Sequence, residues 1–291
     1  MDRAQLDQWC RWGIVGLLLA VLLWGPLGNG GRTQGAFLVL LGLVLAAGVL
    51  WGLRLWISPE PRLLFPAIGW PVLLFTAYAV IRYLTTDLEY PARQELLKIL
   101  ACALMFFLAL NHLHRHKPAN FLLVTLMFLA CLVSGIAFYQ FVTKEPRVWM
   151  FVQPAVYRGR GSGTFTCPDH LAGFLEMLLP LALALVFWGK QKVLTKVFLC
   201  YAAIWLLVGI AITLSRGGWV APIVGLGVFS LALLAQRRFR LWAAIAIALV
   251  VLAGVVLEMK TGAVQKRFNR DNPEDFNQQL QLRVNMWRAA L

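Results

Sequence analysis

Arginine and glycine alternate in the segment 157–163, which reads YRGRGSG. The guanidinium groups of Arg158 and Arg160 can bind phosphate oxygens in pairs, and the intervening glycines let the backbone bend sharply and approach a ligand closely. The segment therefore predicts a site for a phosphate-bearing anion. A flexible loop before a helix would explain the glycines equally well, but it would not explain the two arginines beside them.

The next segment, TFTCPDHLAG (164–173), predicts the start of a helix. Thr166 or Cys167 can cap it, Pro168 suits its first turn, and the carboxylate of Asp169 favours the positive end of the helix dipole. The backbone N–H groups at such a start are unpaired and attract anions. An ordinary capped helix remains the alternative interpretation.

A second helix start is predicted at LSRGG (214–218), where two long apolar runs meet with almost no loop. Ser215 can cap the second run, while Gly217 leaves its first turn bare and Arg216 lies at the membrane boundary. Two helix N-termini with arginines beside them predict a pyrophosphate clamp. In the alternative, Arg216 extends its side chain to the lipid surface and binds no substrate.

The final residues, 276–291, carry an apolar stripe at helical spacing, made of Phe276, Leu280, Val284, Trp287 and Leu291. Arg283 falls at the edge of that stripe. We expect an amphipathic helix that rests on the membrane or on the helix bundle, with Arg283 directed toward it. An interfacial helix whose arginine reaches lipid headgroups is the alternative.

Potential metal ligands are sparse. Cys167 and His170 form a C-x-x-H pair, but two ligands do not make a metal site. Asp87 and Glu89 form an acidic pair in a polar loop, where solvation is the simpler interpretation. We therefore expect no metal and no cofactor. His170 is a weak candidate for a catalytic base, and it can instead form only local hydrogen bonds.

The composition indicates that most of the chain lies in a lipid membrane. Of its 291 residues, 60% are hydrophobic and only 14% are charged, with a mean hydropathy of +0.72, whereas soluble domains are about 25% charged. This excludes a soluble enzyme, a disordered chain and a disulfide scaffold. Apolar runs near the length that crosses a bilayer predict nine helices, at 12–31, 35–53, 63–81, 96–111, 118–143, 171–189, 197–215, 217–236 and 241–257.

We therefore predict an all-α, polytopic membrane bundle that forms one domain over 1–291. Tight basic clusters, QRRFR at 236–240 among them, place the N-terminus in the cytoplasm. Other basic residues then collect on the outer side, in the loop 143–170, the turn 215–218 and the tail 260–291. The positive-inside rule does not explain them. An anionic ligand does, although lipid phosphates or nearby acidic residues are alternative partners.

Three stretches in this order, GSGTFTCPDHLAGFLEMLLPLALAL, LSRGG and LRVNMW, resemble the bacterial O-antigen ligase and polymerase family over 158–291. The resemblance implies a multi-pass glycosyltransferase of the inner membrane with its active site at the periplasmic face. Such proteins take a glycan from an undecaprenyl-pyrophosphate carrier. Ligases pass it to lipid A-core, and polymerases pass it to another carrier-linked glycan. Arginines that match Arg216 and Arg283 hold the pyrophosphate in the family, and no metal is needed.

The sequence departs from the family pattern in two respects. Asparagine is common in the family where Cys167 and Asp169 stand here. The family also continues past the R-x-x-x-W stretch into a larger loop that carries a proposed catalytic histidine, so we expect residue 291 to be followed by more chain in the natural protein.

The sequence thus predicts an inverting, metal-independent glycan transferase whose donor pyrophosphate is bound by four arginines, with three supporting residues. The arginines are Arg158, Arg160, Arg216 and Arg283, and the supporting residues are Ser215, Gly217 and Asp169. The expected partners are the carrier-linked glycan, its acceptor and membrane lipid, but no nucleic acid. A transporter of an anionic solute and a non-catalytic fragment or pseudoenzyme are the alternatives. The motifs do not distinguish a ligase from a polymerase.

Overall fold

The computed structural model describes residues 3–58, 63–113, 116–148, 151–187, 189, 191–234, 281 and 284–285. Its helices are α1 (Arg3–Leu27), α2 (Gln34–Ile57), α3 (Gly69–Leu84), α4 (Glu89–His112), α5 (His116–Thr143), α6 (Pro168–Phe187), α7 (Val193–Ile212) and α8 (Arg216–Leu234), with short 3₁₀ turns η1 (Asn29–Gly31) and η2 (Ala155–Tyr157). Two-residue strands β1 (Arg147–Val148) and β2 (Phe151–Val152) pair antiparallel in the loop after α5.

The predicted helical membrane bundle is confirmed. Six of the described helices are long and apolar enough to cross a membrane, and α3 and residues 217–231 of α8 are shorter apolar helices. The chain is therefore a multi-pass membrane protein. Helices α1 to α8 overlap the first eight predicted spans, with ends that differ by up to nine residues, and the ninth span, 241–257, lies outside the described residues.

The chain divides into two compact units, residues 1–219 and 220–291. The first holds α1 to α7 and the first turn of α8. The second holds the rest of α8, together with Gln281, Val284 and Asn285, which are helical. Each unit is described by itself.

Each helix differs from its predicted span at one end or at both, and the differences in α1 and α3 have a clear structural cause. α1 ends at Leu27 because the next residues leave helical geometry, and Asn29 and Gly30 have φ angles of 58° and 67°, in the left-handed region that terminates helices. α3 begins at Gly69, six residues later than predicted. Residues 63–66 are not helical, because the Asn111 side chain hydrogen-bonds both backbone groups of Leu64. Its Oδ1 accepts from the Leu64 N–H at 2.8 Å, and its Nδ2 donates to the Leu64 carbonyl at 3.4 Å.

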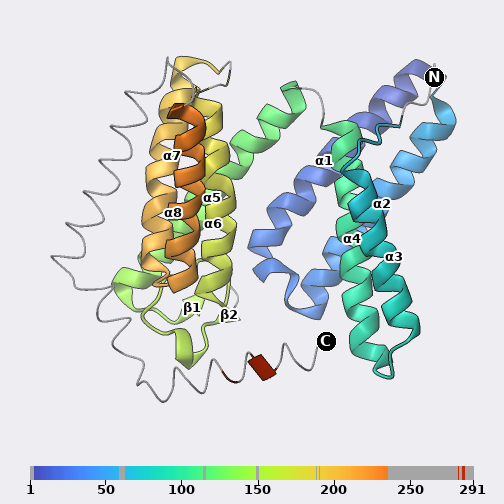
Figure 1. The fold of residues 1–291 in the computed structure, drawn as a ribbon. Helices are drawn as coiled ribbons and strands as arrows, with labels where there is room; N and C mark the ends of the chain where they lie inside the picture. The colour runs from blue at the N-terminus through green and yellow to red at the C-terminus, as the bar shows by residue number, and fades with distance from the viewer. Residues whose placement is uncertain are drawn as a thin grey trace. The chain divides into compact units, whose positions relative to one another are not determined.

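Helices α1, α2 and α4 pack around one apolar cluster, formed by Ile14, Leu18, Ala47 and Leu108. α3 lies along α4 (Figure 1). At the start of α1, Asp7 forms an ion pair with Arg54 at the end of α2, with 2.9 Å between Oδ1 and Nε. This ion pair places the start of α1 beside the end of α2, as an antiparallel hairpin requires.

Helices α5, α6 and α7 lie side by side and bury a second apolar core (Figure 1). The buried positions of α6 recur every three or four residues, at Leu171, Leu175, Leu179 and Ala182, which is one face of a helix. They pack with buried side chains of the neighbouring helices, including Met127 and Val133 of α5 and Leu199 and Leu206 of α7. This three-helix group carries the loop that contains most of the predicted site.

Candidate functional site

The loop between α5 and α6 is held in place by a buried glutamine. The side-chain Oε1 of Gln140 accepts from the backbone N–H of Gly163 at 2.9 Å, and its Nε2 donates to the Gly163 carbonyl at 3.2 Å. Gly163 has a φ angle of 59°, and a Cβ there would lie 2.7 Å from Cγ1 of Val133. Only glycine fits this position without strain, which explains one glycine of the GRGSG segment structurally.

A second buried glutamine orders the first half of the loop. The Nε2 of Gln153 donates to the carbonyl of Arg160 and to the hydroxyl of Ser162, both at 3.1 Å. Its own backbone N–H donates to the Pro146 carbonyl at 2.7 Å. The loop is therefore an ordered part of the fold, because buried side-chain amides fix its backbone in several places.

Arg160 joins the loop to two helix ends. Its Nε donates to the carbonyl of Thr213 at 2.7 Å, and its Nη2 forms an ion pair with Asp169 Oδ1 at 2.6 Å. The Arg160 side chain is 10% exposed, whereas that of Asp169 is 53% exposed. The guanidinium also lies 5.6 Å from the centre of the Tyr157 ring. Arg160 thus fixes the end of α7 beside the start of α6, and its charge is shared with Asp169.

The starts of α6 and α8 lie next to each other, at Pro168 and Arg216, where the capping residues predicted them. The Ser215 hydroxyl accepts from the Gly218 N–H at 3.1 Å, and so caps α8, and it also hydrogen-bonds the Asp169 carboxylate. A Cβ on Gly218 would lie 2.5 Å from the Cβ of Ala172. The first turns of the two helices are therefore in direct contact.

The turn between α1 and α2 completes the site, and sequence reasoning missed it. Oδ1 of Asn29 accepts from the Thr166 N–H at 2.8 Å and from its hydroxyl at 3.3 Å. The same hydroxyl accepts from Nη1 of Arg32 at 3.0 Å, and the Thr164 hydroxyl donates to the Pro26 carbonyl at 2.6 Å. An additional, exposed guanidinium is therefore fixed within a few residues of the start of α6.

The other predicted residues lie in or beside the same region. Arg158 follows η2 and is exposed, and His170 is exposed in the first turn of α6. Cys167 is buried, and its sulfur lies 3.8 Å from Asp169 Oδ2. A hydrogen bond with Cys167, followed by the electrostatic effect of that side chain, raises the pKa of the Tyr157 phenol above its ordinary value.

Two of the predicted arginines are described less fully. Arg216 is the first residue of α8, but the direction of its side chain lies outside what the structure describes. Arg283 lies outside the described residues altogether. Gly217 is exposed in the first turn of α8, and nothing would contact a Cβ there within 4 Å. A common cavity for the four arginines is therefore a prediction that the described part of the chain does not test.

Within the described part of the chain, no group of three or more His, Cys, Asp or Glu side chains is arranged to hold a metal ion. The described residues are of types that can recognise an anion. Two adjacent helix N-termini present backbone N–H groups, and exposed guanidiniums from Arg32 and Arg158 lie in the segments packed around them.

Residues 201–291 match a family model that is described as O-antigen ligase. This confirms the resemblance from residue 201 within α7, through the α7–α8 corner, to the end of the sequence given. The stretch 158–200, which also suggested the family, lies outside the match. No curated protein and no solved structure matches the chain. The match supports a membrane glycosyltransferase role of the ligase or polymerase type.

Proposed function

We propose that the protein transfers a glycan from an undecaprenyl-pyrophosphate carrier to an acceptor at the periplasmic face of the bacterial inner membrane. The observation that carries this proposal is the O-antigen ligase match over 201–291. Its α7–α8 corner is tied by Arg160 to the Arg- and Gly-rich loop at the start of α6. The α7–α8 corner of the matched segment is thus in direct contact with the predicted phosphate loop.

In this proposal Arg216 and Arg283 hold the donor pyrophosphate, and Arg158 adds positive charge from its exposed position in the loop before α6. Arg160, already bound to Asp169 and Thr213, positions the two helix starts. Arg32 is added to this set because its guanidinium is exposed and bound to Thr166, just before α6. Guanidiniums suit this task because they bind phosphate oxygens bidentately and remain charged at all physiological pH values.

The proposed reaction is a single displacement with inversion. The acceptor hydroxyl oxygen forms a bond to the anomeric carbon of the glycan as the bond from that carbon to the pyrophosphate oxygen breaks. The hydroxyl proton passes to a base, for which His170 is the candidate within this chain, and the negative charge that develops on the pyrophosphate is stabilised by the arginines. No metal is required, since fixed cations neutralise the leaving group.

The proposed periplasmic location rests on the alternation of the helices. The turn at 28–33, the loop 144–167 and the corner 213–215 lie at one end, joined by the hydrogen bonds of Asn29, Thr166 and Arg160. The predicted cytoplasmic segments lie at the other ends of the same helices, where Asp7 meets Arg54. Basic residues favour the cytoplasmic side of short loops, so the end that carries the candidate site faces the periplasm.

The test is substitution in the native host. Arg216→Ala and Arg283→Ala should each abolish the transferred surface glycan while membrane levels of the protein stay normal. Lysine at either position should restore little, because an ammonium cannot replace the bidentate contacts. Arg93→Ala, which removes an exposed arginine of α4 outside the site, is the matched control and should have no effect. Normal surface glycan in both site variants would refute the proposal.

Deletion in the same host distinguishes the two reaction types. A ligase deletion leaves lipid A-core bare while long carrier-linked polymer accumulates. A polymerase deletion instead gives cores capped by single repeats, or no polymer at all. Electrophoresis of lipopolysaccharide together with analysis of the carrier-linked pool identifies which outcome occurs.

A further inference from the structure

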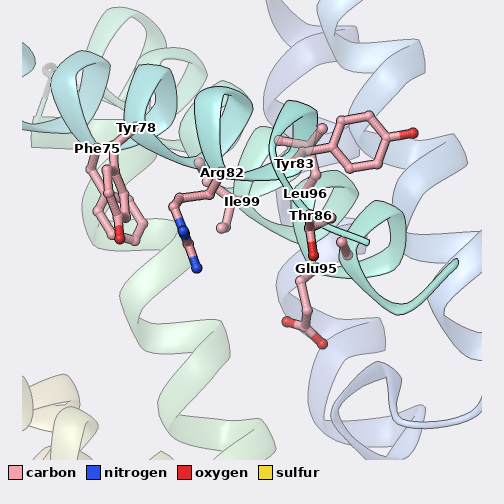
Figure 2. Close-up of a pocket in the computed structure, with 10 residues that line it drawn as sticks. Phe75, Tyr78, Arg82, Tyr83, Thr86, Glu95, Leu96 and Ile99 are labelled. Atoms are coloured by element: carbon pink, nitrogen blue, oxygen red, sulfur yellow. The ribbon is translucent and has the colours of Figure 1, made fainter. Parts of the chain in front are cut away.

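A groove of about 300 Å³ lies between α3 and α4, apart from the site described above. Its lining comes from one face of each helix: Phe75, Tyr78, Ala79, Arg82, Tyr83 and Thr86 on the α3 side, and Ala92, Glu95, Leu96 and Ile99 on α4. Figure 2 shows the side chains of Phe75, Tyr78 and Arg82 on one side of α3.

The polarity of the groove changes along its length. The aromatic rings of Phe75 and Tyr78, with centres 6.4 Å apart, lie at one end (Figure 2). Thr86 and Glu95 lie at the other end, near the turn that joins the two helices, with Arg82 between. Seven residues of helix, about 10 Å at 1.5 Å per residue, separate Phe75 from Arg82. The groove is therefore apolar toward the middle of the membrane and charged near its surface.

The charges at the polar end favour an anion. Glu95 is already paired with Lys98, with 2.7 Å between Oε1 and Nζ. Arg82 is exposed and forms no ion pair with another described residue. Because Lys98 compensates the carboxylate of Glu95, Arg82 is the lining residue whose charge is left for an anion.

The occupant must also match the apolar end. α3 exposes large apolar side chains along its whole length, including Leu74, Ile81 and Leu84, as a helix surrounded by acyl chains does. A soluble anion would leave the aromatic end unfilled. A molecule with a phosphate head and a hydrocarbon tail contacts both ends in the observed order.

We propose that this groove binds one anionic glycerophospholipid from the surrounding membrane. Its phosphate is held by the guanidinium of Arg82, and one acyl chain lies along Phe75, Tyr78 and Ile99. This inference does not depend on the proposed glycan transfer, because no residue of the groove belongs to that site.

The test uses the purified, detergent-solubilised full chain and defined lipids. Native mass spectrometry should detect one tightly retained phosphatidylglycerol per chain, and added phosphatidylglycerol should raise the unfolding temperature more than phosphatidylcholine does. Arg82→Gln should weaken phosphatidylglycerol binding about tenfold or more, because hydrogen bonds to a charged phosphate are lost. Arg82→Lys should retain part of the affinity.

The matched control is Arg93→Gln, which removes one positive charge from an exposed site on α4 outside the groove. It should bind phosphatidylglycerol like the wild type, and free glycerol phosphate should stabilise none of the proteins. Equal binding by the Arg82→Gln and Arg93→Gln proteins would overturn the proposal. So would equal stabilisation of the wild-type protein by phosphatidylcholine and phosphatidylglycerol, a comparison that requires no variant to fold.

Discussion

The side-chain amide of Gln140 pairs with both backbone groups of Gly163, as a second peptide unit would in a sheet. Gln140 lies near the end of α5 in an otherwise apolar run and is 4% exposed. A buried amide in a membrane helix is stable only when its hydrogen bonds are formed. This pair therefore determines where the arginine-bearing loop leaves the helix bundle.

Replacing Gln140 should loosen that loop. Gln140→Leu leaves the backbone groups of Gly163 without partners and should lower the free energy of unfolding by about 1–3 kcal/mol. Limited proteolysis should then cut within 144–167 before it cuts the helices. The matched control is Gln8→Leu, at an exposed position of α1. Equal protease resistance of the two variants would show that the loop is held by other contacts.

The two neighbouring glycines of the α7–α8 corner should respond differently to alanine. A Cβ on Gly218 would lie 2.5 Å from that of Ala172, whereas one on Gly217 meets nothing within 4 Å. Gly218→Ala should therefore lower the unfolding temperature by several degrees, because packed helices do not accommodate an extra methyl group without strain. Gly217→Ala should leave stability unchanged or slightly raised.

A compensating change tests the same contact. Ala172→Gly removes the methyl group that obstructs a side chain at position 218, so the Gly218→Ala, Ala172→Gly double variant should recover much of the lost stability. The measurement is thermal unfolding, in one detergent, of the wild type, the two single variants and the double variant, which together form a double-mutant cycle. Additive losses would mean that the two first turns do not touch as described.

The sequence predicts the elements of the site better than their connections. The helix starts at Pro168 and Arg216 follow from local capping chemistry, so the residues that define them are neighbours in the chain. The bonds of Asn29 to Thr166 join positions 137 apart, and no periodic pattern encodes such a pair. For the contact between Gln140 and Gly163, the sequence does offer a signal. A single glutamine inside an apolar span must find a hydrogen-bond partner, although its type alone does not say which residue that partner is.

The role of Arg160 shows a second limit of sequence reasoning. The residues beside Arg160 in the sequence predict that its guanidinium binds phosphate. The charge and the N–H groups of the same guanidinium also suit Asp169 and the carbonyl of Thr213, which it contacts in the structure. The choice between ligand and internal partner depends on which groups the fold brings within 3 Å. That information arises from helix packing, and it is absent from the segment 157–163 itself.

The α1–α2 turn should depend on the acceptor oxygen of Asn29. Asn29→Ala removes two hydrogen bonds to Thr166 and places alanine at a φ angle of 58°, so stability should fall by about 2 kcal/mol. Asn29→Asp keeps the oxygen and tolerates the same backbone conformation, so it should remain near the wild type. Thermal unfolding measures both, and a larger loss for the aspartate would contradict the assignment.

Arg160 should contribute more to folding than its partner Asp169 does. Arg160→Ala removes bonds to both Asp169 and Thr213 from a largely buried position, and should lower stability by about 1–3 kcal/mol. Asp169→Asn retains an acceptor for Arg160 at a half-exposed position, so the expected loss is below about 1 kcal/mol. Arg160→Lys should resemble alanine, since one ammonium cannot reach both partners. Comparable losses for Arg160→Ala and Asp169→Asn would contradict this order.

A binding measurement with the proposed donor group tests whether Arg216 holds the pyrophosphate. Purified wild-type protein in nanodiscs is titrated with undecaprenyl pyrophosphate and, separately, with undecaprenyl monophosphate. We expect the wild type to bind the pyrophosphate preferentially. This binding should be weakened about tenfold or more in Arg216→Ala, weakened similarly in Arg216→Lys, and unchanged in Arg93→Ala. Equal affinities of the wild type and Arg216→Ala for the pyrophosphate would contradict this role of Arg216.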